Sequence, residues 1–159
     1  MKLVSRTDID LAAAVLFPVL TDAAFFEALA VRKGVRVKRL DDNPGVVAGS
    51  AWRIHLPYRG RERVITHRVH RIDEPRRLML VGNSGSFRFE IEALLSPMSR
   101  ESTRLAISLD VRPETFGARV LLQTLKLGKG RLQARFDQRL AQVAQVFMQR
   151  ADALLPRGV

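Results

Sequence analysis

The stretch RLQARFDQRLAQVAQVFMQRADALL, residues 131–155, decides the fold of this chain. Its apolar residues recur at steps of three or four, which is the period of one face of an α-helix. They are Leu132, Phe136, Leu140, Val143, Phe147, Ala151 and Leu155. So wide an apolar stripe predicts one long amphipathic helix, over residues 131–155, that lies against a large surface.

The sequence before this helix predicts that surface. From Val35 onward apolar and polar residues alternate, which is typical of antiparallel strands with one solvated face. Turn-forming segments separate the alternating runs, at residues 41–45, 58–61, 73–76, 82–85 and 96–102. With a first strand inside residues 1–11, the chain is predicted to be α+β, with an antiparallel sheet of about six to seven strands.

Three shorter helical pieces are also predicted. Residues 12–20 form the first, with Pro18 expected to kink or shorten it because proline lacks an amide donor. Asp22 is well placed to cap a second helix that ends at Gly34. A third lies between Pro113 and Gly130, and we expect the Gly128–Gly130 segment to interrupt it before the long helix.

Composition limits the class of protein. The 159 residues are 47% hydrophobic and include no linker, repeat or low-complexity tract, so we expect one globular domain over 1–159. The absence of cysteine excludes disulfides, thiolate metal sites and cysteine nucleophiles. Asp8 and Asp10 precede the apolar run 11–20, unlike the basic lead-in of a secretory signal, and the run is too short to span a bilayer. These features predict a cytoplasmic protein.

The order of these elements resembles the START/Bet v 1-like superfamily, also called SRPBCC or polyketide cyclase/dehydrase-like. The local cues are residues 9–12 running into Val15 and then 20–22, Gly49 before the Trp52 strand, and residues 69–78 with the turn Pro75-Arg76-Arg77-Leu78. The resemblance implies a helix-grip fold, in which a curved sheet wraps the long helix and leaves an apolar cavity. Members of the superfamily bind lipids, sterols, quinones or polyketides, and a minority are enzymes.

Large apolar residues could form such a cavity or belong to an ordinary core. The candidate ligand-pocket residues are Phe26, Trp52, Ile54, Tyr58, His67, Met79, Phe87, Phe89, Phe136, Leu140 and Phe147. Tyr58 is expected at the rim, and Ser5 and Thr7 share the parity of Leu3 and Ile9, so they join His67 as polar anchors.

Among the candidates, His67 is the residue best suited to ligand recognition or acid–base chemistry. It points with Ile65 and Val69, so it could hydrogen-bond a ligand or act as a base, although a histidine satisfied by an ordinary partner explains it too. His70 falls on the opposite face of the strand, so the two cannot share a metal ion. No catalytic residue, metal site or cofactor is assigned.

The formal net charge is +11, and 22 arginines accompany only 5 lysines, a skew expected of a GC-rich genome. Five arginines lie on or beside one predicted hairpin, largely on its outer face: Arg53, Arg59, Arg61, Arg63 and Arg68. The leading hypothesis is a binding protein for a small hydrophobic ligand, without assigned catalysis. The alternatives are a cyclase- or dehydratase-like enzyme using His67, and a basic interaction module that contacts RNA, ribosome or anionic membrane.

Overall fold

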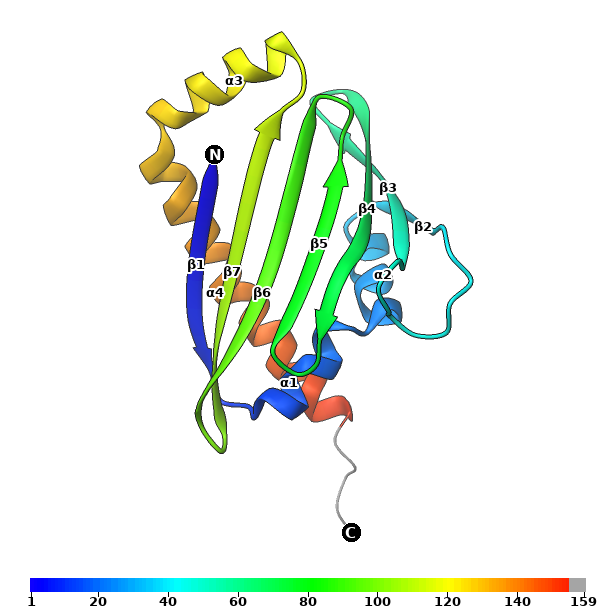
Figure 1. The fold of residues 1–159 in the computed structure, drawn as a ribbon, viewed down its shortest axis with the longest axis vertical. Helices are drawn as coiled ribbons and strands as arrows, with labels where there is room; N and C mark the ends of the chain where they lie inside the picture. Colours follow the sequence, from blue (N-terminus) through cyan, green and yellow to red (C-terminus); the bar gives the residue numbers. More distant parts are fainter. Residues whose placement is uncertain (155–159) are drawn as a thin grey trace.

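The computed structural model describes residues 1–154 and consists of one sheet, a long helix and three shorter helices (Figure 1). The strands are β1 (Lys2–Ile9), β2 (Arg36–Arg39), β3 (Ala51–Tyr58), β4 (Arg61–Asp73), β5 (Arg77–Asn83), β6 (Phe87–Ser99) and β7 (Ser102–Pro113). The helices are α1 (Ala13–Leu20), α2 (Ala23–Arg32), α3 (Phe116–Leu127) and α4 (Lys129–Leu154). Their order is the one predicted from the sequence.

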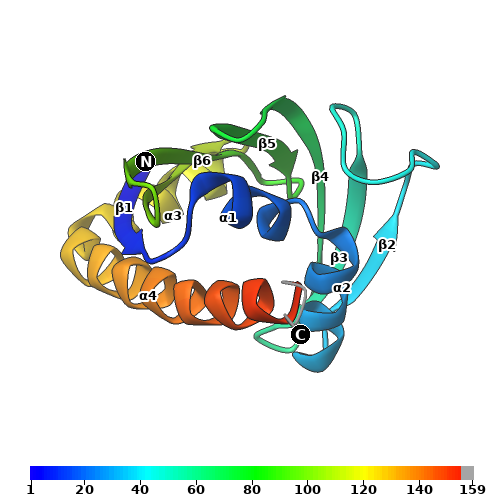
Figure 2. The same ribbon diagram turned by 90° about the horizontal axis from the view of Figure 1, so that it is seen from below.

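The seven strands form one antiparallel sheet in the order β1-β7-β6-β5-β4-β3-β2. Strands β2 to β7 lie side by side in the order in which they follow one another along the chain. Strand β1 forms one edge of the sheet and pairs with β7, with Leu3 opposite Leu109. The sheet curves over α1 and α4, and α2 lies beside β2 and β3 (Figure 2). This is the curved antiparallel sheet with a long C-terminal helix that the sequence predicted.

The core sits at the α1 end of the sheet. Ile9, Leu16 and Leu105 are fully buried there, and Phe17 and Val69 are nearly so. Pro18 lies inside α1, which ends only two residues later. Asp22 caps α2, since its Oδ1 accepts a hydrogen bond from the Phe25 amide at 3.1 Å.

The long helix differs from its prediction in two places. It begins at Lys129, so only Gly128 separates it from α3 and Gly130 lies within its first turn. Within the stripe, Ala144 is buried and Val143 is 39% exposed, because the side of α4 that packs against β1 and α1 includes Ala144 and leaves Val143 at its edge. Leu155, the last residue of the predicted helix, lies outside the described residues.

The β6–β7 hairpin is longer than predicted. The sequence indicated a broad turn over residues 96–102, but β6 continues to Ser99 and β7 starts again at Ser102. In residues 1–154, no single helix has the length and hydropathy needed to cross a membrane, and α1 and α2 reach that level only together, across a 56° bend.

Candidate functional site

The face of the sheet that looks toward α4, here called the inner face, is only half closed. At the α1 end most of its residues are buried, whereas toward α3 and the β3–β4 hairpin most of them keep part of their surface exposed. We call this second group the open half of the inner face; it consists of Ile54, Ile65, Phe89, Ile91, Leu109 and Val111. None of the six packs against the buried core cluster. The sheet therefore carries an apolar surface that the rest of the described chain does not fully cover.

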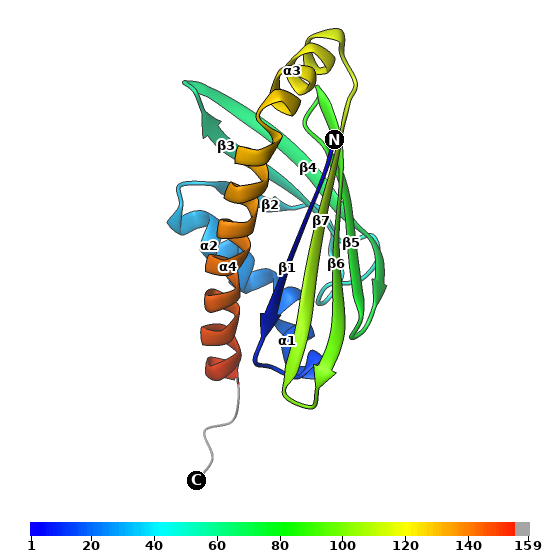
Figure 3. The same ribbon diagram turned by 90° about the vertical axis from the view of Figure 1, so that its left-hand side faces the viewer.

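The position of α4 explains this partial exposure. The helix lies along β1 and α1, and its backbone stays further from the central strands (Figure 3). Gln133 adds a polar contact at this position, because its Nε2 donates a hydrogen bond to the Val4 carbonyl oxygen at 2.8 Å. On the stripe, Leu140 and Phe147 are buried near the core, while Phe136 is half-buried at the more open end.

His67 lies beside the open half of the inner face. Its ring stacks on the Trp52 ring with 5.4 Å between centroids and 19° between planes. Burial lowers the pKa of the His67 imidazole below its ordinary value, so the ring is neutral at pH 7. Within residues 1–154 neither ring nitrogen has a hydrogen-bond partner, and neither is fully sealed from solvent. The imidazole is thus available to an added polar group.

Gly82 makes this arrangement possible. It lies directly across from both His67 and Phe89 in the sheet register. A Cβ at this position would lie 2.5 Å from the Thr66 carbonyl oxygen, 2.6 Å from the Phe89 ring and 2.9 Å from the His67 Cβ. Only glycine lets the two side chains approach each other over the strand between them.

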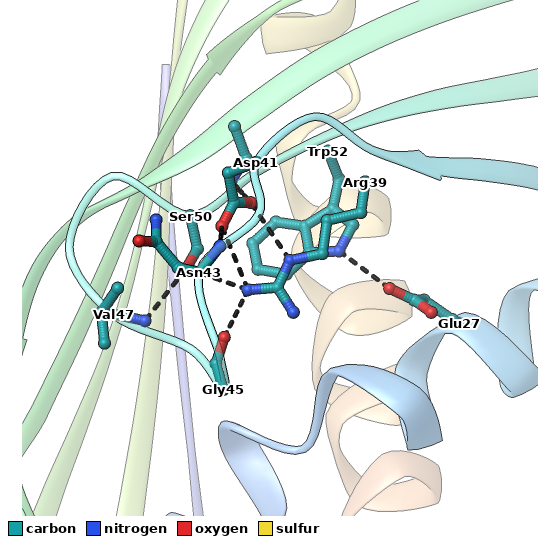
Figure 4. Close-up of polar contacts among 9 residues, drawn as sticks. Glu27, Arg39, Asp41, Asn43, Gly45, Val47, Ser50 and Trp52 are labelled. Atoms are coloured by element: carbon teal, nitrogen blue, oxygen red, sulfur yellow. Dashed lines mark hydrogen bonds and ion pairs between the residues drawn. The ribbon is translucent and has the colours of Figure 1, made fainter.

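A polar network holds Trp52 in place (Figure 4). Its Nε1 donates a hydrogen bond to Glu27 Oε1 on α2 at 3.1 Å, and the Arg39 guanidinium lies 5.2 Å from the ring centroid. Arg39 in turn pairs with Asp41, whose carboxylate also accepts a hydrogen bond from the Ala51 amide. The Arg39 hydrogen bond, followed by that of Ala51, holds the pKa of Asp41 well below its ordinary value. Trp52 is therefore held by contacts with three side chains, those of Glu27, Arg39 and His67.

A second contact joins α2 to the end of α4. Arg150 donates two hydrogen bonds to Asp22 Oδ2, at 2.8 and 3.1 Å, and its guanidinium lies over the Phe25 ring. Beside it, Phe26 meets Phe147 edge to face with centroids 6.0 Å apart. This cluster closes the α2 edge of the inner face, with Phe26 still 38% exposed.

The remaining pocket candidates are dispersed. Phe87 shares the inner face at the α3 end of β6, and Tyr58, 52% exposed, lies at the tip of the β3–β4 hairpin. Met79 falls on the outer face, because its neighbours Leu78 and Leu80 point inward. The polar candidates on β1 lie inward as their parity indicated, with Ser5 buried and Thr7 half-buried.

The register divides the five hairpin arginines, which the sequence placed largely on the outer face. Arg53 and Arg68 do lie outside. Arg61 and Arg63 pair with Tyr58 and Leu56 and so share the parity of Trp52. Arg59 occupies the turn, with a positive φ of 49°. The predicted basic hairpin face is therefore split between two sides of the sheet.

The outer face carries two open grooves. The larger, about 570 Å³, crosses β3 to β6 among mostly polar and charged residues such as Thr66, Arg68 and Glu90. The smaller, about 440 Å³, lies at the β3–β4 hairpin near His55 and Glu62. No group of three or more potential metal ligands gathers anywhere in residues 1–154.

Sequence reasoning missed three residues of the site: Glu27, Arg39 and Gly82. The sequence predicts a turn at Gly82, whereas the structure places this residue within β5; a glycine at the end of an apolar strand is itself a sign of close approach. Glu27 and Arg39 depend on how α2 and β2 pack around Trp52, and nothing local in the sequence shows that.

Comparison with known proteins places the fold. No protein-family model and no curated protein sequence matches the chain. Among solved structures, TTHA0849 of Thermus thermophilus has a TM-score of 0.69 at 16% identity, covering 94% of this chain and 99% of that one. The Zhui aromatase/cyclase of a Streptomyces species also has a TM-score of 0.69, at 14% identity, covering 100% and 99%.

A START superfamily protein of Mycobacterium smegmatis has a TM-score of 0.55 at 18% identity, covering 86% of this chain and 97% of that one. At such identities the likeness concerns the fold, and it agrees with the element order, the curved sheet and the long C-terminal helix described above. The chain therefore has the helix-grip fold of the START/Bet v 1-like superfamily, as its sequence predicted.

Proposed function

We propose that the protein binds one small hydrophobic molecule between the open half of the inner face and α4. The observation that carries this proposal is the partial exposure of Ile54, Ile65, Phe89 and Ile91, which face α4 without packing into the core. Covering such a surface with an apolar ligand is favourable by about 25 cal/mol for each Å² removed from water.

The chemistry of the ligand follows from the surroundings. The lining is aliphatic and aromatic, which suits a lipid, quinone or polyketide-like molecule. His67 offers a neutral imidazole that can donate to a carbonyl oxygen or accept from a hydroxyl group. A largely apolar molecule with one carbonyl or hydroxyl group fits both features.

The neutral fluorescent probe N-phenyl-1-naphthylamine tests this proposal. Its neutrality avoids simple attraction to a chain of net charge +11. We expect saturable binding with energy transfer from Trp52, the only tryptophan of the chain. The bound probe should also raise the melting temperature, because a ligand that binds only the folded state stabilises it.

Two adjacent residues on β4 supply a matched control. Ile65 belongs to the open half of the inner face, whereas Val64 lies on the outer face and is 42% exposed. Ile65→Gln should weaken probe binding at least tenfold, and Val64→Gln should leave it within about twofold. Equal effects of the two substitutions, or no saturable binding at all, would overturn the proposal.

A second candidate function is proton transfer to or from the bound ligand by His67. The favouring observation is a neutral imidazole with no hydrogen-bond partner in residues 1–154, which is the state a general base needs. Any turnover of a bound ligand should then disappear in His67→Gln while probe binding persists. Unchanged turnover in that variant would remove this candidate and leave the binding proposal intact.

A further inference from the structure

Helix α3 has apolar residues on two opposite sides. Ala118 and Leu122 are buried against the fold, and the Thr115 side chain caps the helix by accepting a hydrogen bond from the Ala118 amide at 3.1 Å. On the other side, Phe116 is 79% exposed, Val120 46% and Leu127 90%. At 3.6 residues per turn these three residues fall within roughly 40° of one another around the helix axis. Such an exposed apolar ridge is unusual on a surface helix.

The ridge lies in a segment without negative charge. Residues 115–136 contain no aspartate or glutamate, but they contain five exposed cations: Arg119, Lys126, Lys129, Arg131 and Arg135. None of the five forms an ion pair within residues 1–154. The segment therefore combines protruding apolar side chains with uncompensated positive charge.

We propose that α3 docks on an anionic lipid surface. Phe116, Val120 and Leu127 would enter the boundary between headgroups and acyl chains, and the flanking cations would contact lipid phosphates. This combination of an apolar ridge and a basic flank is what an interfacial helix requires. The inference does not depend on the protein binding a ligand.

A second copy of the chain and a nucleic acid each fail to match one part of this segment. In a symmetric dimer built on α3, the five cations of one copy would face those of the other without any acid between them. A nucleic acid would satisfy the cations, but it would leave the aliphatic side chains of Val120 and Leu127 without a matching surface. An anionic membrane is complementary to both parts of the segment.

Co-sedimentation of the full chain with vesicles tests the proposal. We expect binding to vesicles of phosphatidylcholine mixed with phosphatidylglycerol, and much weaker binding to phosphatidylcholine alone. Moderate salt should weaken the binding without abolishing it, since the apolar contribution is not screened.

Two double variants of this segment, each with a matched control elsewhere in the chain, distinguish binding through the segment from binding through net positive charge. Phe116→Ser with Leu127→Ser should lower partition at least tenfold, whereas the control Val31→Ser with Met98→Ser, also at exposed apolar positions, should change it less than twofold. Lys126→Gln with Lys129→Gln should weaken partition roughly 30-fold, at about 1 kcal/mol per lysine. The control Lys2→Gln with Lys33→Gln removes the same charge from exposed positions elsewhere.

Three results would overturn the proposal. The first is an equal effect of each α3 variant and its control, which would mean that binding follows net charge alone. The second is RNA binding that depends on the two lysines, with no vesicle binding. The third is a dimer that dissociates in the Phe116 and Leu127 variant, again with no vesicle binding.

Discussion

Substituting Gly82 by alanine tests the close packing behind His67. The added Cβ would approach the Thr66 carbonyl oxygen to 2.5 Å and the His67 Cβ to 2.9 Å, and neither atom can rotate away. Overpacking of this kind costs about 3 kcal/mol at the upper end of its usual range. The lower conformational freedom of alanine in the unfolded chain returns about 0.7 kcal/mol. We therefore expect a net loss of about 2 kcal/mol in the free energy of unfolding.

The assay is thermal and urea unfolding of Gly82→Ala beside the parent chain. For a chain of this size, a loss of about 2 kcal/mol lowers the melting temperature by roughly 4–8 °C. Gly117→Ala is the matched control, because a Cβ at that helical position would meet nothing within 4 Å. The control should be as stable as the parent or up to about 1 kcal/mol more stable. A Gly82→Ala variant as stable as the parent would refute the reasoning.

Three further substitutions test the contacts around the site. Asp22→Asn keeps the cap of α2 and removes only the ion pair with Arg150, so urea unfolding should show a loss of about 1 kcal/mol, against about 2 kcal/mol for Asp22→Ala. An Asp22→Asn variant as stable as the parent would show that the ion pair is unimportant. Asp41→Asn should be less stable than the parent at pH 7. Because the pKa of Asp41 is lowered in the folded state, the difference in free energy of unfolding between the two proteins should narrow as pH falls below 3.8. A difference that stays constant in acid would argue against the Arg39 contact. Because the pKa of His67 is lowered in the folded state, the imidazole of the unfolded chain takes up a proton at a higher pH than that of the folded chain. The parent should therefore lose stability relative to His67→Gln as pH falls below 6.5. Parallel profiles of unfolding free energy against pH for the two proteins would contradict the burial of the imidazole.

Much of the fold could be predicted because its signals are local. The alternation from Val35 onward, the capping residue Asp22 and the apolar stripe of the last helix each depend on residues close in sequence. Where prediction failed, tertiary packing decided the outcome. Ala144 is buried in place of Val143 because α4 leans on β1 and α1, a direction that helical spacing cannot specify.

The site was less predictable than the fold. The inward direction of His67 and Trp52 follows from strand parity, and the sequence showed it. The faces on which Met79 and the hairpin arginines lie depend on where each strand starts and ends, and the pattern of residues does not show this. The contacts of Glu27 and Arg39 with Trp52 join three elements, so they required the structure.

Isoleucine methyl NMR during titration with N-phenyl-1-naphthylamine tests the proposed binding site most directly. Ile54, Ile65 and Ile91 lie on the open half of the inner face, whereas Ile9 is fully buried and Ile72 packs against the core cluster. If the ligand lies between the sheet and α4, the first three methyl signals should shift together and saturate at one equivalent, with Ile9 and Ile72 little changed. Saturable binding that leaves Ile54, Ile65 and Ile91 unshifted would contradict the account.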